Sequence, residues 1–203
     1  MPQLEIEQRG TQRRIRDAVF ACMADTDMDK IRVSDVIRIA HVSRSTFYRY
    51  FDDVPSVVLQ FEDDLLANMR AINNIALKAR FSTNQLDATP TMITRMEMLA
   101  DHRDEIVALN GPHGDPGFVH KATVFMHDYL SQRLSEVLGP SDDLEFYLAF
   151  VLAGHNNLIQ FWLEKRPEVS PHHVASTLNK LYYAPFFLTD DARRTLPHAP
   201  RLD

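Results

Sequence analysis

The chain has 203 residues, of which 45% are hydrophobic and 25% charged, a composition typical of a globular protein with a substantial buried core. Its 28 acidic against 22 basic residues give a formal net charge of −6, which argues against a uniformly basic protein that coats nucleic acid or anionic membrane. A single cysteine excludes an internal disulfide, and the longest apolar run, from Tyr147 to Gly154, is far shorter than a membrane span, so we expect a soluble cytoplasmic protein.

The hydrophobic pattern predicts three short helices at the start of the chain. Apolar residues that recur at intervals of three and four indicate a helix over residues 8–25. A second helix fits residues 33–40, and Ser43 can cap a third helix that runs to about residue 51. We expect these helices to form one small unit over residues 8–54.

In the rest of the chain, a capping side chain before a proline marks further helix starts. These starts fall at Pro55, Pro90, Pro116 and Pro171. Three glycines and two prolines predict a turn-rich loop over residues 110–117, whereas residues 144–163 are apolar around most of a helix circumference and predict burial on both faces. No strand pattern of convincing length is present. We therefore predict an all-α fold, with a helical domain over residues 55–188 and a frayed tail over residues 189–203.

Basic residues concentrate in the N-terminal unit. Residues 9–50 hold nine basic and five acidic side chains, a net charge of +4, which leaves −10 for the rest of the chain. An acidic body repels phosphate, so any contact with nucleic acid should be made by the first 50 residues. On charge alone, a merely solvated charged face is the alternative.

The informative motif is the run IRVSDVIRIAHVSRSTFYRYF, residues 31–51. Two short helices separated by about three residues around His41 have the spacing of a helix-turn-helix, in which the first helix braces the second against the major groove. We expect the apolar side chains to pack inward, namely Val36, Ile37, Ala40, Val42, Phe47 and Phe51. The other face carries groups that can donate to phosphates and read base edges, namely Ser43, Arg44, Ser45, Thr46, Tyr48, Arg49 and Tyr50.

The run VSRSTFYRYF, together with the short helix before it, resembles the signature of the TetR family of one-component transcriptional regulators. The resemblance implies a homodimer that binds a palindromic double-stranded DNA operator. It also implies a divergent C-terminal domain that holds a small ligand and the dimer interface. A repressor that a small molecule releases from DNA is the leading hypothesis.

Two positions depart from the family pattern. The lysine usually found three residues after the position of Phe51 is replaced by Val54, which Asp52 and Asp53 precede. The usual turn glycine is His41, which tolerates the left-handed backbone region less easily than glycine does. Operator affinity is therefore expected to depend more on arginines, namely Arg14, Arg44 and Arg49.

Two C-terminal helices are candidates for the dimer interface. One side of the 144–163 helix can pack into its own domain and the other against a partner chain, and the last helix offers a second apolar stripe. The expected interface residues are Phe150, Gly154, Asn157, Phe161, Val174, Leu178, Leu181 and Tyr182. The alternative is a larger monomeric core.

A small-molecule pocket is expected in the same domain, lined by soft or flat side chains with one or two polar anchors. The candidates are Met69, Met92, Met96, Phe125, Met126, Tyr129, His155 and Asn156, and ordinary core packing is the alternative for each of them. Arginine and lysine are scarce in the apolar runs here, so we expect a neutral or weakly polar effector. The helix that begins at Pro55 should carry the signal from Met69 to the reading unit.

Other functional classes have weak support. His120 and His127 lie two helical turns apart, and the adjacent His172 and His173 point in different directions on a helix, so we expect no metal site. We also expect neither a bound cofactor nor enzymatic activity, because the sequence contains no glycine-rich phosphate loop and no nucleophile elbow. The competing hypothesis is a helical interaction or enzyme-like protein whose N-terminal unit no longer reads DNA.

Overall fold

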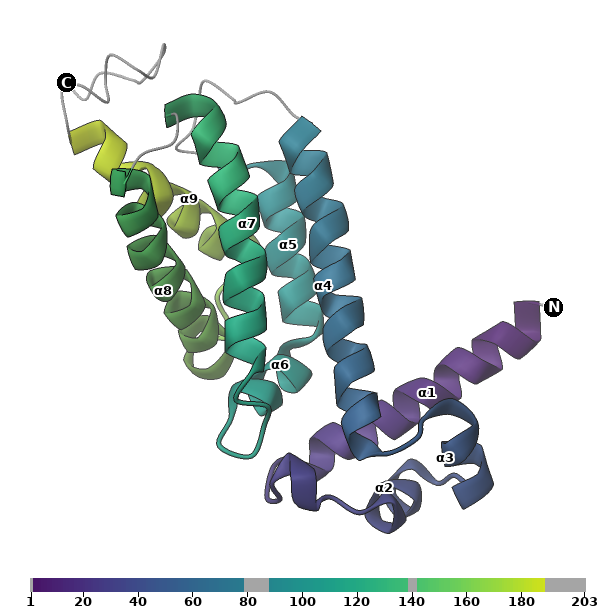
Figure 1. Ribbon diagram of the computed structural model, residues 1–203. Helices are drawn as coiled ribbons and strands as arrows, with labels where there is room; N and C mark the ends of the chain where they lie inside the picture. Colours follow the sequence, from purple (N-terminus) through teal and green to yellow (C-terminus); the bar gives the residue numbers. More distant parts are fainter. Residues whose placement is uncertain (1, 79–87, 139–141, 189–203) are drawn as a thin grey trace. The chain divides into compact units, whose positions relative to one another are not determined.

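All regular structure in the described part of the chain is helical, which confirms the all-α prediction (Figure 1). The computed structural model describes residues 2–78, 88–138 and 142–188, so the expected tail at 189–203 lies outside the described residues. Contacts divide the chain into two compact units. Unit 1 holds the described residues of Met1–Ala67 and Arg103–Val119, and unit 2 holds those of Asn68–His102 and His120–Asp203. The functional boundary at residue 54 stays a prediction.

Unit 1 contains the three N-terminal helices, the start of the fourth, and one helix from the middle of the chain. Its elements are α1 (Pro2–Cys22), the 3-10 helix η1 (Met28–Lys30), α2 (Val33–Ala40), α3 (Arg44–Tyr50), the first part of α4 (Val54–Lys78) and α6 (Arg103–Asn110). The bounds of α2 are as predicted. Helix α1 covers most of the predicted span of residues 8–25, but it begins earlier, at Pro2, and ends earlier, at Cys22. The 3-10 helix and α6 were not foreseen.

The core of unit 1 forms where α1 packs against α2 and α4. Ile15, Val19 and Met23 of α1 are buried, as the helical periodicity predicts. Phe20 is also buried, and its ring meets that of Phe61 in α4 edge to face at 5.1 Å. These contacts fix the platform that carries α3.

The predicted turn-rich loop lies between α6 and α7 (Phe118–Leu138) and is fastened to the region after α1. His113 Nδ1 lies 2.6 Å from Oδ1 of Asp27, and the amide of Met28 donates to the His113 carbonyl oxygen at 3.0 Å. Gly114 is required here because a Cβ would fall 2.0 Å from the carbonyl oxygen of Leu109. The loop therefore packs as part of unit 1.

Unit 2 is built from the remainder of α4 together with α5 (Pro90–Asp101), α7, α8 (Asp142–Lys165) and α9 (Pro171–Leu188). Two predicted caps are confirmed: Thr89 accepts from the amide of Met92, and Ser170 accepts from the amide of His173. The start predicted at Pro116 is wrong. Asp115 instead accepts from the amide of Gly117 inside the loop, and α7 begins at Phe118. None of the helices in the described ranges is long and apolar enough to cross a bilayer.

Candidate functional site

The helix-turn-helix predicted at residues 31–51 is formed by α2, a short turn and α3. At the start of α3, Ser43 caps the helix by accepting from the amide of Thr46 at 3.0 Å, as predicted. Its hydroxyl also lies 2.7 Å from that of Thr46 and 2.9 Å from that of Ser45. Three hydroxyl groups therefore meet at the exposed N-terminus of α3, where amides and hydroxyls can together face a phosphate.

The inner side of α3 is held by an aromatic core. Phe47 is completely buried, and its ring lies 6.0 Å from that of buried Phe51 and 5.5 Å from that of Tyr48. Val36 and Ala40 of α2 are buried as well, whereas Ile37 and Val42 are half-buried. This packing fixes the rotation of α3 and so decides which side chains face outward.

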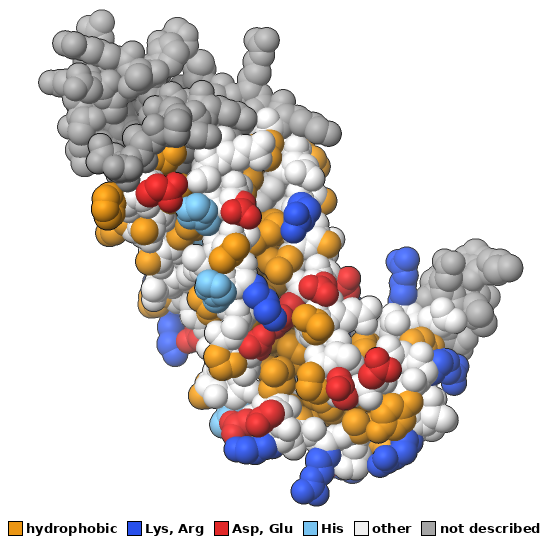
Figure 2. All heavy atoms as spheres, in the orientation of Figure 1, with side chains coloured by type: hydrophobic (Ala, Val, Ile, Leu, Met, Phe, Trp, Pro, Cys, Tyr) orange, Lys and Arg blue, Asp and Glu red, His pale blue; other side chains and the backbone are white. Residues whose placement is uncertain are grey.

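The outer side of α3 carries four exposed polar side chains, Arg44, Ser45, Tyr48 and Arg49. Thr46 and Tyr50 are half-buried at its flank, and the Arg49 guanidinium lies 5.8 Å from the centre of the Tyr50 ring. Figure 2 shows Lys and Arg side chains along the lower edge of the view, where Figure 1 places η1, α2 and α3. All seven predicted contact residues thus lie on or directly before one short helix.

The turn before α3 has the strained backbone that the family pattern indicates. His41 ends α2 with φ 53° and ψ 47°, in the left-handed region, and it is the only non-glycine residue with positive φ in the described chain. Its amide donates to the carbonyl oxygen of Ile37. A glycine would take this conformation without the steric cost of a Cβ.

The start of α4 differs from the family pattern in a second way. Val54, which stands in place of the usual lysine, is buried in the core of unit 1. Asp53 accepts from the amide of Ser56 at 2.8 Å, and the Ser56 hydroxyl accepts from the amide of Asp53 at 3.2 Å. A carboxylate of the chain itself therefore occupies the positive end of α4, which favours arginines elsewhere as the phosphate contacts.

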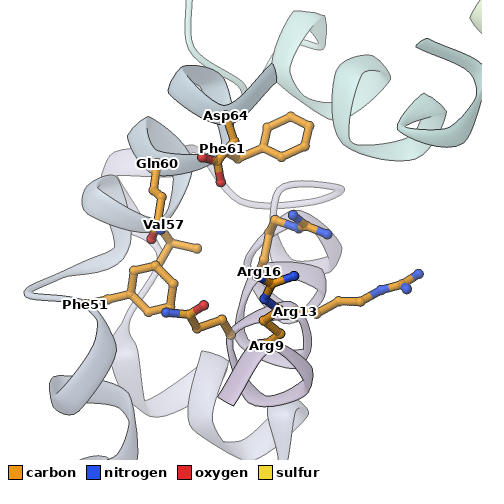
Figure 3. A pocket seen from close by; sticks show the side chains of 9 residues that line it. Arg9, Arg13, Arg16, Phe51, Val57, Gln60, Phe61 and Asp64 are labelled. Carbon is orange, nitrogen blue, oxygen red and sulfur yellow. The ribbon is translucent and has the colours of Figure 1, made fainter. Parts of the chain in front are cut away.

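A cleft of about 250 Å³ lies between α1 and α4 within unit 1 (Figure 3). It is lined by Arg9, Gln12, Arg13, Arg16, Phe51, Val57, Gln60, Phe61 and Asp64. The Arg16 guanidinium lies 5.4 Å from the centre of the Phe61 ring, and its Nη2 lies 3.7 Å from Oε1 of Glu105 in α6. Arg16 therefore ties α1 to both α4 and α6.

In unit 2 the predicted pocket residues are buried to different degrees. The four methionines, Met69, Met92, Met96 and Met126, are buried. Phe125 and Tyr129 are half-buried beneath guanidiniums, that of Arg70 at 5.4 Å from the Phe125 ring centre and that of Arg95 at 5.1 Å from the Tyr129 ring centre. Asn156 donates to the Thr123 hydroxyl at 2.7 Å, so it ties α8 to α7.

The sequence analysis did not identify a hydrogen-bonded pair of polar side chains in the interior of unit 2. Arg95 of α5 donates to Oδ1 of Asn73 in α4, and both residues are buried. The signal that could have identified it is helical spacing. Arg95 lies three residues after Met92 and four before Leu99, on the buried stripe of α5 that also includes Met96.

His155, a predicted polar anchor, is buried in the same region. Its Nδ1 lies 2.5 Å from the hydroxyl of Tyr182 in α9. Burial, reinforced by the positive charge of Arg95, lowers the pKa of His155 to about 3. The imidazole is therefore neutral at physiological pH and acts as a hydrogen-bonding group.

The predicted dimer residues separate into two sets. Phe150, Gly154, Asn157 and Phe161 are exposed on one face of α8, where Phe146 is exposed as well, and Leu181 is exposed on α9. Val174 and Leu178 are instead buried in the core of their own chain, and Tyr182 is engaged by His155. Placing Val174 and Leu178 at an interface between chains is therefore corrected, because they support α9 from inside; Tyr182 is half-buried, and its place at the interface stays a prediction.

The histidines do not assemble a metal centre in the described part of the chain. His127 lies 3.4 Å from a carboxylate oxygen of Glu145, and His120, His172 and His173 are exposed. Among the described residues no group of three His, Cys, Asp or Glu side chains is placed to hold a metal ion.

Comparison with known proteins supports the resemblance noted at residues 31–51. Residues 87–183 match the TetR family model described as "Transcriptional regulator C-terminal region". A TetR transcriptional regulator from Streptococcus agalactiae 2603V shares 20% identity and a TM-score of 0.56, with 88% of this chain and 96% of that chain covered. A TetR-family transcriptional regulator from Streptomyces coelicolor shares 16% identity and a TM-score of 0.63, with 94% and 90% covered.

A third solved structure, "Dihydroxyacetone kinase operon activator DhaS", shares 18% identity and a TM-score of 0.57, with 88% of this chain and 97% of that chain covered. Identities this low show a common fold. No curated protein matches the sequence. Through the match over residues 87–183, just under half of the chain, and the helix-turn-helix at residues 31–51, the chain is similar to the TetR family of transcriptional regulators.

Proposed function

We propose that this protein is a cytoplasmic, homodimeric repressor that binds a palindromic operator through α3 and leaves the DNA when a small molecule binds unit 2. The observation that carries the proposal is the two-sided character of α3. Arg44, Tyr48 and Arg49 are exposed on one side, and Phe47 locks the other side into the core. A helix fixed in this way can enter the major groove with a defined set of donors.

Charge supports this orientation. Residues 9–50 carry a net charge of +4, and the rest of the chain carries −10. The acidic remainder is repelled by DNA phosphates, so the protein is steered toward DNA with its N-terminal unit first. Because Val54 is buried and Asp53 caps α4, we assign the main phosphate contacts to arginines, with Arg44 and Arg49 foremost.

The exposed face of α8 supports a dimer. Phe146, Phe150 and Phe161 lie on one side of the helix and are 78%, 77% and 57% exposed. Large apolar side chains gathered on one exposed helix face are typical of an interface. A second copy of the chain is the occupant we propose, because the operator of this family is palindromic and a twofold axis pairs the same face of both copies.

We propose repression as the sign of regulation. One protein of similar fold is titled an operon activator, so the fold is compatible with either sign. We favour repression because binding at an operator blocks transcription without any further contact surface. A small molecule in unit 2 would act through α4, which contributes residues to both units, from Val57 in unit 1 to Met69 in unit 2.

The test measures binding of a fluorescent duplex from the region upstream of the protein's own gene. Arg44→Glu should weaken binding by roughly tenfold or more, because one good base or phosphate contact contributes about 1–3 kcal/mol. The matched control is Arg166→Glu, which makes the same charge change at an exposed position after α8 and should leave affinity unchanged. Equal binding by the two variants would favour the competing hypothesis, a helical interaction or enzyme-like protein that does not read DNA.

A further inference from the structure

The interior of unit 2 contains a cation without a counter-ion. Arg95 lies within α5 with 3% of its surface exposed. Removing a charge from water is costly, so buried charges in proteins are normally paired with an opposite charge. Among the described side chains no carboxylate pairs with this guanidinium. Its contacts are Oδ1 of Asn73 and the face of the Tyr129 ring.

Two hydrogen-bond donors at this position have no acceptor. They are Nε of Arg95 and Nδ2 of Asn73, both fully buried. The two side chains are hydrogen-bonded to each other, so both donors belong to one small region. A guanidinium presents its N–H groups as a planar fork that matches the two oxygens of a carboxylate.

The neighbours of Arg95 add polarity but no second charge. Tyr129 comes from α7, and neutral His155 from α8 is held by the hydroxyl of Tyr182 from α9. Together with Asn73, these residues form what we call the Arg95 cluster, to which α4, α5, α7, α8 and α9 each contribute one side chain. Buried Met92 and Met96 flank Arg95 on α5 and provide apolar surface.

We propose that unit 2 binds a small molecule with one negative charge and an apolar body, a monocarboxylate, whose carboxylate is held by Arg95 and Asn73. The inference rests on the proposed function, because it names the chemical class of the effector. One cation favours one negative charge: a neutral molecule leaves Arg95 uncompensated, and a dianion leaves one of its own charges unpaired. The sequence-based expectation of a neutral effector rested on the scarcity of arginine and lysine in the apolar runs of this domain, and Arg95 lies within one of them.

The first test needs no ligand and follows thermal unfolding of the full-length protein after dialysis. Arg95→Met keeps most of the volume of the side chain and removes a buried charge that has no counter-ion, so the variant should unfold at the wild-type temperature or above it. A lower unfolding temperature would show that Arg95 is a structural residue, and the proposal would be wrong.

The second test compares acids with neutral analogues of the same shape at constant ionic strength. The probes are hexanoate, octanoate and benzoate, each paired with its primary amide. At least one acid should raise the unfolding temperature by more than its amide does. Arg95→Met should abolish this difference, whereas Arg70→Gln, which removes an exposed guanidinium of the same unit, should preserve it. Acids that match their amides in every pair, or a difference that survives in Arg95→Met, would overturn the proposal.

Failure of this inference is distinguishable from failure of the proposed function. DNA binding of the wild-type protein and of Arg95→Met is measured in parallel with the fluorescent duplex. Selective DNA binding without any preference for acids refutes the Arg95 site alone. Acid binding without selective DNA binding refutes the repressor and leaves the site in place.

Discussion

Phe150 offers a quantitative test of the dimer. The residue is 77% exposed in the single chain, so Phe150→Ala removes little packing within its own fold. Complete burial of a phenylalanine side chain contributes about 1.5–3 kcal/mol, so burying the exposed part contributes about 1–2 kcal/mol. A twofold interface contains the residue twice, and the variant should therefore weaken the dimer by about 2–4 kcal/mol. This change corresponds to a roughly 30-fold to 700-fold rise in the dimer Kd.

Sedimentation equilibrium over a range of protein concentrations measures that Kd. The matched control is Ile75→Ala, since Ile75 is 62% exposed on α4 and lies outside the α8 face. We expect a wild-type dimer at micromolar concentration, an unchanged Kd for the control, and a partly or fully monomeric Phe150→Ala with wild-type helicity. A monomeric wild-type protein, or equal Kd values for the two variants, would refute the assignment of this face to dimerisation.

Three further predictions concern stability. His41→Gly should raise the free energy of unfolding by about 0.5–1 kcal/mol, because relief of the left-handed strain exceeds the added entropy of the unfolded chain; urea unfolding checks this, and a destabilised variant would contradict it. Asp53→Ala should lower the free energy of unfolding by about 1 kcal/mol, because the α4 cap is lost. The variant should bind DNA at least as tightly as the wild-type protein, because it removes a carboxylate that repels phosphate. His155 has a folded-state pKa of about 3 and an ordinary value of 6.5, so the unfolded chain binds a proton that the folded chain does not, and stability falls as pH drops below 6.5. His155→Gln should remove this contribution from the pH dependence of urea unfolding, about 0.7 kcal/mol per pH unit at pH 6.5 rising to about 1.4 kcal/mol per pH unit near pH 5. An unchanged slope would show that the imidazole is protonated in the fold.

The helix-turn-helix was predictable because its determinants are local. A capping serine, a short apolar stripe in α2 and an aromatic pair in α3 specify their structure within about twenty residues, and Ser43, Val36 and Phe47 take the predicted positions. The requirement for left-handed backbone at His41 also follows from a single position in the motif. The cap and the apolar stripe depend on residues three or four apart, a spacing that helical periodicity detects.

The interior of unit 2 was harder to predict because it depends on residues far apart in the sequence. Arg95 and Asn73 are 22 residues apart, and the sequence alone places neither beside the other. Val174 and Leu178 form an apolar stripe that suits an interface and a core equally well, and only packing shows that they are buried within the chain. The same limit applies in unit 1, where the contact between His113 and Asp27 joins residues 86 positions apart and leaves no local signal in the sequence.

Selection of bound duplexes from a random-sequence pool tests the central claim most directly. The wild-type protein, at modest salt, should enrich an inverted repeat whose half-site centres lie about 10 base pairs, or a multiple of that, apart. Arg44→Glu, carried through the same selection, should enrich nothing, since it alters the exposed face of α3 and leaves the buried Phe47 core intact. A wild-type pool that stays random, or a repeat that Arg44→Glu enriches equally, would contradict operator reading by α3.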